Sequence, residues 1–248
     1  MLFLQGSETQ GANWHVTEKA PTVYCRIYYL YSGQVLYRDA QTARNLKSGC
    51  LYVFPSTLPY EMSHNPNDPI NCLFLHVDIA PFLLSSLLEL PVSQDSFLLH
   101  LLEAMDTYIH CHPQKEIDSV MESLAAALVT YLVSAEYLQA PPGKIADTIM
   151  YISEHLNEKI TVELLSELCG YHKQYYIRLF STYLGTTPHQ YLISYRMKRA
   201  FSMLMEGKSV SETADTVGYP ELRNFIRAFK KYYGYSPSQV KKYIHYTN

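Results

Sequence analysis

Apolar and polar residues follow one pattern before residue 80 and another after it. From Trp14 to Ala80 the apolar residues form short runs rich in β-branched and aromatic side chains, with turn signals such as Ser32-Gly33 between them. Such runs predict strands, and several in succession predict a β-sandwich or a barrel. From Pro81 onward the apolar residues recur at spacings of three and four, which predicts helices.

The β region is expected to hold several short strands. The clearest are Val23–Tyr31, Gln34–Asp39, Cys50–Pro55 and Asn71–Ile79. The segment Met1–Asn13 is polar after its first four residues, so it is expected to be a loosely held lead-in to the sandwich.

Three amphipathic runs follow the β region. We expect helices over Phe82–Leu90, Ser96–His110 and Glu116–Gln139. Amphipathicity does not say what covers an apolar face, so these helices either pack on the sandwich or pair with a second chain. The run Ala140-Pro141-Pro142-Gly143 breaks the helical pattern and marks a linker.

The segment from Thr161 to Tyr243 contains the same unit twice. Gly170 and Gly218 are 48 positions apart, and after one inserted residue Arg178 and Arg227 are 49 apart. Self-similarity at a fixed period indicates a repeated structural unit.

Each copy of the unit predicts two short helices joined by a tight turn. A hydroxyl residue, Thr161 or Ser209, caps the first helix, and a glycine ends it. The second helix is expected over Lys173–Tyr183 in one copy and Glu221–Tyr233 in the other. One copy alone could be an ordinary helical hairpin, but a duplicate that keeps its arginine favours paired helix-turn-helix motifs.

The repeat resembles the DNA-binding domain of the AraC/XylS family of bacterial transcription regulators. The second copy carries V-S-E-T-A-D-T-V-G-Y and F-I-R-A-F-K-K-Y-Y-G-Y-S-P-S-Q, and the first carries G-Y, R-L-F and G-T-T-P. The resemblance implies a long helix over Pro188–Met205, promoter DNA as a partner, and an activator that contacts RNA polymerase. Y-Y-L-Y-S-G, L-K-S-G-C-L-Y-V-F-P and L-F-L-H-V resemble the cupin-like jelly-roll sensor domain that precedes this domain in many such regulators.

The expected fold class is therefore two-domain α+β. Residues 1–80 would form a cupin-like jelly-roll β-sandwich that senses an effector, and residues 81–139 would form helices that flank it and dimerise the chain. Residues 140–144 would be the linker. Residues 145–248 would form an all-α domain with two helix-turn-helix motifs.

Charge and cysteine content sharpen this reading. The net charge is −3, but after Gly143 there are 14 Lys and Arg against nine Asp and Glu, and before Lys144 there are six against 14. A basic half is typical of DNA binding. The five cysteines are scattered without a C-x-x-C pair, which favours free thiols in a reducing cytoplasm. No apolar run reaches membrane-spanning length.

Residues early in each second helix are the candidates for contact with DNA. Arg suits guanine and Gln suits adenine, while lysines suit phosphates and position the protein without specifying sequence. By position in the resembling family the candidates are Lys173, Gln174, Ile177, Arg178, Arg223, Asn224, Arg227, Lys230 and Lys231. Lys198 and Arg199 are further candidates for phosphate contact.

Polar groups inside the sandwich are the candidates for effector binding. Aromatic walls with Arg and His suit a sugar or a carboxylated small molecule, although tyrosine-rich strands also build ordinary cores. The candidates are Arg26, Tyr28, Tyr37, Arg38, Tyr60, His64 and His76.

The sequence predicts no catalysis, metal or cofactor. Catalytic cupins hold a metal through a His-x-His cluster, whereas this β region has only isolated histidines. His110-Cys111-His112 has the spacing, but it lies on a predicted helix, where alternate side chains point apart. Two alternatives stay open: a DNA-binding regulator controlled by a partner protein or by abundance, and a metal-dependent cupin enzyme with a helical appendage.

Overall fold

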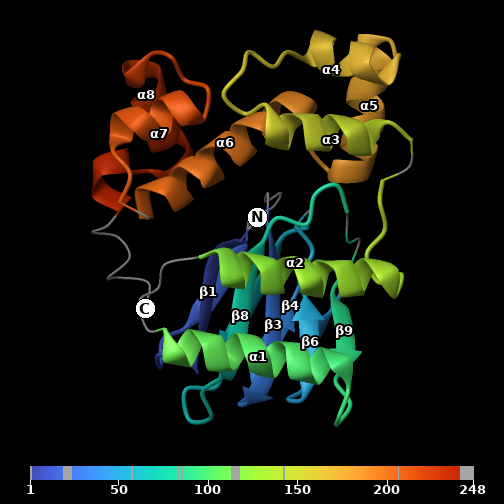
Figure 1. Cartoon of the computed structure of the whole chain (residues 1–248), viewed down its shortest axis with the longest axis vertical. Coiled ribbons are helices and arrows are strands. Elements are labelled where there is room, and N and C mark those ends of the chain that lie inside the picture. The colour runs from blue at the N-terminus through green and yellow to red at the C-terminus, as the bar shows by residue number, and fades with distance from the viewer. Residues whose placement is uncertain are drawn as a thin grey trace. The chain divides into compact units, whose positions relative to one another are not determined.

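The chain divides into two compact units, Met1–Gln139 and Ala140–Asn248. The structure is a computed structural model (Figure 1), and it describes residues 2–18, 24–56, 58–82, 84, 86–112, 118–141, 143–205 and 207–240. The predicted linker falls at the boundary between the units, and its Pro142 lies outside the described residues, as do residues 241–248 of the predicted DNA-binding domain.

The first unit is built on two antiparallel sheets. The five-stranded sheet has the order β1 (Leu2–Thr9), β8 (Asn71–Val77), β3 (Cys25–Ser32), β6 (Cys50–Val53) and β9 (Leu88–Pro91). The four-stranded sheet has the order β2 (His15–Glu18), β7 (Tyr60–His64), β4 (Val35–Arg38) and β5 (Ala43–Leu46). Every pair of neighbouring strands is antiparallel.

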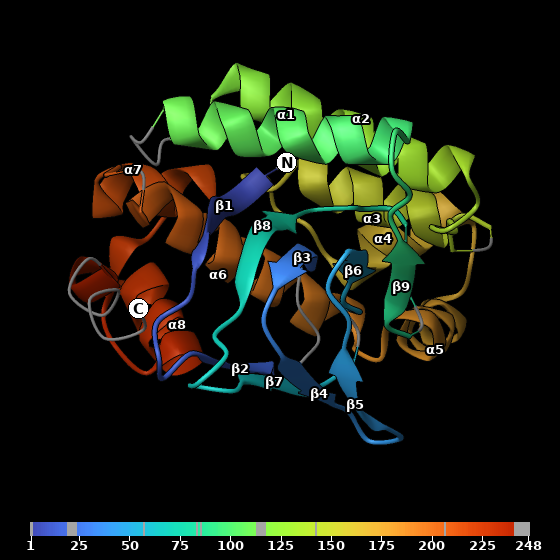
Figure 2. The ribbon, with the colours of Figure 1, turned by 90° about the horizontal axis from the view of Figure 1, so that it is seen from below.

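Helices α1 (Phe97–Cys111) and α2 (Ser119–Ser134) cover the outer face of the five-stranded sheet, and the four-stranded sheet covers its inner face (Figure 2). Side chains alternate between the two faces of a strand, so β3 serves both layers. Ile27 and Tyr29 pack under the helices, whereas Tyr28 and Leu30 pack between the sheets. The space between the sheets is therefore aromatic.

Two expectations for this unit are wrong. The lead-in is strand β1, which pairs with β8 from Leu2 opposite Val77 to Thr9 opposite Asn71. Among the described residues of Phe82–Leu90 no helix forms, because Leu88–Pro91 form β9 and pair with β6. Short apolar runs fit a strand or a helix equally well, and the sandwich therefore extends past residue 80.

The second unit is all-helical. Its elements are α3 (Ile145–Glu154), α4 (Val162–Cys169), α5 (Lys173–Leu184), α6 (Pro188–Met205), α7 (Val210–Thr216), α8 (Leu222–Tyr233) and a short 3₁₀ turn at Pro237–Gln239. Helix α6 runs from the α3–α5 group to the α7–α8 pair (Figure 1). A two-sheet antiparallel domain followed by an all-helical domain confirms the predicted fold class.

Candidate functional site

The first helix-turn-helix unit is α4, a turn and α5. The Thr161 hydroxyl caps α4 by accepting a hydrogen bond from the Leu164 amide at 3.1 Å. Gly170 ends it at φ +66°, where its amide donates to the Glu167 carbonyl at 2.8 Å and the Tyr171 amide to the Ser166 carbonyl at 2.9 Å. This left-handed glycine cap sets the direction in which α5 starts.

The second helix-turn-helix unit, which runs from α7 to α8, repeats these local interactions. The Ser209 hydroxyl accepts from the Glu212 amide at 3.1 Å. Gly218 lies at φ +76°, with its amide bonded to the Asp215 carbonyl at 3.1 Å and the Tyr219 amide bonded to the Ala214 carbonyl at 2.9 Å. The sequence repeat is thus a repeat of caps and turns.

Two buried aromatic rings fix the inner face of each second helix. Tyr176 and Phe180 on α5 are fully buried with ring centroids 5.7 Å apart, and Phe225 and Phe229 on α8 have the same separation. Burial of this aromatic pair turns the opposite helix face outward. Arg178 and Arg227 are consequently both exposed, and they lie at equivalent places on α5 and α8.

On α5 the exposed face combines one tethered and one stacked cation. Lys173 forms an ion pair with Glu163 on α4. The Arg178 guanidinium lies over the Tyr175 ring, with Cζ 5.5 Å from its centroid. Gln174 is exposed and Ile177 is half-buried, so Gln174 is the freer of the two to reach a base.

On α8 three side chains form a hydrogen-bonded chain. The Asn224 amide nitrogen donates to the Glu221 carboxylate at 2.8 Å, and Arg227 donates to the Asn224 amide oxygen at 2.8 Å. These bonds hold the Arg227 guanidinium beside Asn224. A shallow groove of about 610 Å³ follows this helix, lined by Leu222, Arg223, Ile226, Arg227 and Lys230.

The lysine candidates differ in access. Lys230 and Lys231 are exposed near the end of α8. Lys198 on α6 is only 9% exposed, which argues against the expected phosphate contact. The spacing along α6 could not show this, because the buried side of a long connecting helix depends on both units that it joins.

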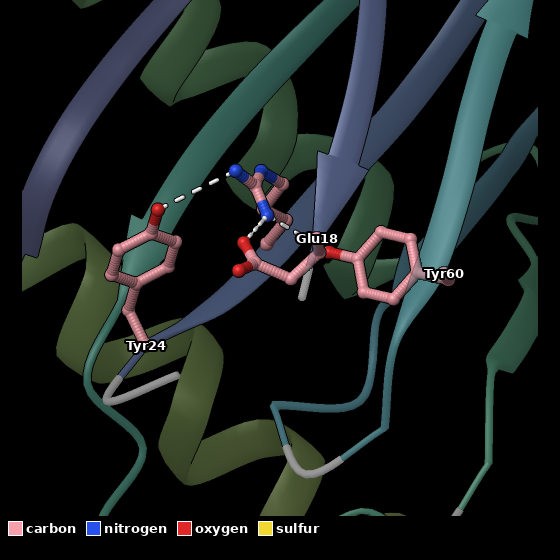
Figure 3. Close-up of polar contacts among 4 residues, drawn as sticks. Glu18, Tyr24 and Tyr60 are labelled. Atoms are coloured by element: carbon pink, nitrogen blue, oxygen red, sulfur yellow. Dashed lines mark hydrogen bonds and ion pairs between the residues drawn. The ribbon is translucent and has the colours of Figure 1, made fainter. Parts of the chain in front are cut away.

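The β domain brings part of the effector set together around Arg26. The guanidinium forms an ion pair with Glu18 on β2 and donates hydrogen bonds to the hydroxyls of Tyr60 at 3.1 Å and Tyr24 at 3.4 Å (Figure 3). Its buried Nε has no hydrogen-bond partner among the described residues. Glu18 and Tyr24 were not among the predicted residues, because only the long-range pairing of β2 with β7 places Glu18 here.

An aromatic stack continues from this cluster. His76 lies parallel to Tyr24 at 4.8 Å and to Tyr28 at 6.5 Å between ring centroids. Burial raises the pKa of Tyr60 and of Tyr28, so both hydroxyls keep their protons at neutral pH and remain donors. Tyr37 is fully buried, with its ring 5.7 Å from that of Tyr60.

The other two predicted effector residues lie elsewhere or have structural partners. Arg38 is exposed, on the opposite face of β4 from Tyr37. His64 is buried, accepts from the Ile70 amide at 3.3 Å through Nδ1, and places Nε2 3.1 Å from the Ala12 carbonyl. Those bonds make Nε2 the protonated nitrogen and tie His64 to two loops of the sandwich.

Neither a membrane-spanning helix nor a metal-binding cluster is found among the described residues. No described helix is long and apolar enough to cross a membrane. Within the described ranges no group of three or more His, Cys, Asp and Glu side chains is placed to hold a metal ion.

Comparison with known proteins places this architecture. The helix-turn-helix domain family matches residues 165–243. A probable transcriptional regulator, LumQ, from Photobacterium leiognathi is 34% identical over 95 residues, which are 38% of this chain and 38% of LumQ. The chain thus spans about two-fifths of the length of the first curated relatives it matches.

Two further proteins match over nearly the whole chain. The raffinose operon transcriptional regulatory protein RafR from Pediococcus pentosaceus is 25% identical over 88% of this chain and 84% of its own. The crystal structure of ToxT from Vibrio cholerae O395, bound to (E)-4-(8-methylnaphthalen-1-yl)but-3-enoic acid, superposes with a TM-score of 0.61 at 10% identity, over 99% and 97% of the two chains. The curated relatives are regulators by name, and their family is not one of enzymes. The chain thus carries a C-terminal helix-turn-helix domain behind an N-terminal two-sheet β domain, as expected from its resemblance to AraC/XylS-type regulators.

Proposed function

We propose that this chain is a transcription regulator that binds promoter DNA through α5 and α8 together. The observation that carries the proposal is the equivalent exposure of Arg178 and Arg227, each set opposite a buried aromatic pair. An exposed guanidinium on the outward face of a recognition helix can donate two hydrogen bonds to guanine in the major groove. Two such helices in one domain would enter successive grooves, about 34 Å apart.

The two helices divide the contacts by type. Arg178 and Gln174 on α5, and Arg227, Asn224 and Arg223 on α8, read bases. Lys173, Lys230 and Lys231 contact phosphates, which fix register without specifying sequence. Ile177 packs on thymine methyl groups.

The test is selection of duplexes from a randomised library by the full chain, followed by footprinting of the selected sequence. The proposal predicts two protected segments on one face of the duplex, about one helical turn apart. Protection that does not fall in two segments, or that does not depend on the DNA sequence, would refute the proposal.

The N-terminal domain is proposed to control this binding through a small molecule held at Arg26. A buried guanidinium beside aromatic rings favours a ligand with a carboxylate, which would replace the Glu18 carboxylate on Arg26. Glu18 ends β2, an edge strand that pairs only with β7 among the described strands, so its exchange disturbs little of the sheet. The ToxT structure contains a butenoic acid ligand, which supports the same ligand class, whereas the name of RafR points to a sugar.

Calorimetric titration of the full chain separates these ligands. The probes are the naphthalenyl butenoic acid and raffinose, and Arg26→Met is the variant. We expect heat of binding with the acid alone, lost in Arg26→Met. If only raffinose binds, the proposed ligand is a sugar and not a carboxylate. If neither compound binds, control by a partner protein or by abundance is favoured.

We propose that the chain dimerises through the α1–α2 pair. Phe97 on α1 is 60% exposed and Val120 on α2 is 45% exposed, so the outward side of this pair carries apolar surface. A dimer would present two helix-turn-helix domains to neighbouring sites, and an effector that favours one dimer arrangement would shift DNA affinity. The proposed regulator is an activator that contacts RNA polymerase at the promoter.

A further inference from the structure

The Arg196 side chain on α6 contacts the main chain that leads into the first helix-turn-helix unit. Its Nη2 donates hydrogen bonds to the Leu156 carbonyl at 3.1 Å and the Glu158 carbonyl at 2.7 Å. Both carbonyls lie between α3 and α4, directly before the helix that starts the first unit. A single guanidinium nitrogen thus fixes α6 to the entry of that unit.

The same guanidinium also contacts the second unit. Its Cζ lies 5.6 Å from the centroid of the Tyr219 ring, in the turn between α7 and α8. The Tyr219 ring packs in turn on Phe225, with centroids 5.8 Å apart, and Phe225 belongs to the buried aromatic pair of α8. Arg196 therefore links the main chain that leads into the first helix-turn-helix unit to the aromatic core of the second.

The two turn glycines differ in their surroundings, and only the glycine between α7 and α8 lies against Arg196. A Cβ on Gly218 would lie 2.5 Å from the Leu156 carbonyl oxygen and 2.6 Å from Nη2 of Arg196. A Cβ on Gly170, the equivalent glycine, would have Lys144 Nζ as its nearest neighbour at 3.7 Å. The turn between α7 and α8 thus directly contacts the main chain between α3 and α4, and no room is left there for a side chain on Gly218.

The physical chemistry of Arg196 suits a directional link. Burial lowers the pKa of Arg196, yet arginine keeps its charge in proteins. A planar guanidinium that donates to carbonyls in its plane and stacks a ring on its face fixes both position and angle. Its Nε is buried without a hydrogen-bond partner among the described residues. An unpaired buried donor lowers the stability of the fold, so a residue that only filled space here would be better replaced by an apolar one.

We propose that Arg196 is a positioning residue that holds the two helix-turn-helix units at one relative orientation, and thereby sets the spacing of the two DNA segments that α5 and α8 read. The proposal rests on the proposed DNA binding for its functional consequence, but not for its structural one. Without the link, α6 still connects the units, but their relative orientation is free to vary.

The structural consequence is measured on the full chain without DNA. Exposed Glu167 and Asp215 occupy equivalent places beside the two turns, so each is replaced by cysteine and spin-labelled after the exposed Cys111 is changed to serine. Pulsed electron resonance then gives the distribution of label distances. We expect a single narrow distribution in this background, and a broader one in Arg196→Met because several arrangements become populated.

The functional consequence is measured with duplexes selected by the wild-type chain. Inserting about five base pairs between the two protected segments, half of a turn, moves the second one to the opposite face of the DNA. We expect the wild-type protein to lose on the order of 100-fold in affinity, because simultaneous engagement becomes impossible. Arg196→Met should bind the selected duplex more weakly, and it should lose less than about tenfold on insertion because its avidity is already reduced.

Two companion variants separate positioning from folding. Tyr219→Leu removes the other half of the link and should reproduce Arg196→Met, whereas Tyr219→Phe keeps the ring and should match the wild type in both measurements. Unchanged affinity for a duplex with one protected segment shows that each unit is folded.

Each outcome decides something. Equal label distributions and equal insertion penalties in Arg196→Met and the wild type would overturn the role of Arg196. A wild-type chain that selects no duplex would refute the proposed DNA binding instead, and the label distances would still test the link.

Discussion

At the scale of single residues, the two exposed arginines are held in different ways. Arg178 rests on the Tyr175 ring, which limits the plane of the guanidinium but leaves its rotation free. Arg227 is bonded to Asn224, which is bonded to Glu221, and this chain fixes the direction of its donors. Position 224 corresponds to position 175 in the repeat, so under the proposed function the second helix-turn-helix unit would read DNA with the more ordered arginine.

The difference predicts different effects of removing the supporting side chain. Asn224→Ala should relax base selectivity under α8, with discrimination falling by about 1–3 kcal/mol at one base pair, the value of a bidentate contact. Tyr175→Ala is the matched variant in the first unit and should lower affinity with little change in selectivity. Dissociation constants for duplexes with single-base changes measure both, and equal selectivity losses would contradict the assignment.

The thiols give a second prediction at this scale. Burial raises the pKa of Cys25 and of Cys72 to about 12 and also raises that of Cys169, while Cys111 is exposed. The thiolate is the reactive form. In the native protein at pH 8 we therefore expect a maleimide reagent to modify Cys111 alone, as mass spectrometry of peptides would show. Modification of Cys25 without unfolding would contradict the packing of β3.

The residue-level predictions from sequence succeed and fail for physical reasons. Tyr37 and Arg38 were both expected inside the sandwich, but neighbours on a strand face opposite ways, so one had to point outward. Exposure of Arg178 and Arg227 follows from apolar spacing along one helix and is confirmed. The link through Arg196 was not predicted, because it joins residues 40 positions apart in the chain.

At the scale of elements, the helices of the C-terminal domain and the four clearest strands were predicted closely, whereas β1 and β9 were missed. Helix starts and ends carry local signals, so the predicted cap at Thr161 and the predicted end at Gly170 agree with α4. The helix over Pro188–Met205, which the family resemblance implied, agrees with α6. Strand β1 depends on β8, almost 70 residues away, and no local pattern announces that pairing. The sequence therefore predicts the DNA-binding domain better than the β domain.

The two turn glycines give a prediction at this scale. Gly170→Ala should destabilise its unit by about 1–2 kcal/mol, the cost of a left-handed alanine. Gly218→Ala should cost more than Gly170→Ala, because its Cβ would also meet the Leu156 carbonyl at 2.5 Å. Hydrogen exchange of the α4 and α7 amides in the full chain measures both losses. Equal losses would mean that the turn between α7 and α8 does not contact the main chain at Leu156.

At the scale of the whole molecule, charge separates the two units. The chain carries excess negative charge before Lys144 and excess positive charge after Gly143. Positive charge would attract the DNA backbone, and negative charge would keep the β domain away from it. This division fits a regulator whose β domain meets an effector or a second copy of the chain.

The division predicts how a fragment behaves. Residues 144–248 alone should bind the selected duplex more weakly than the full chain, because a lone module loses the second site that a dimer supplies. Fluorescence anisotropy at fixed salt compares the two, with light scattering to report the oligomeric state. Equal affinities, or a full chain that stays monomeric, would remove the dimer from the account.

The central claim is that α5 and α8 read DNA together through Arg178 and Arg227. The most direct measurement is footprinting of the selected duplex by the wild-type chain, Arg178→Ala and Arg227→Ala, each checked for an unchanged helical circular dichroism spectrum. The account predicts two protected segments with the wild type and loss of sequence-specific protection in both variants. Wild-type footprints retained by both variants would contradict it.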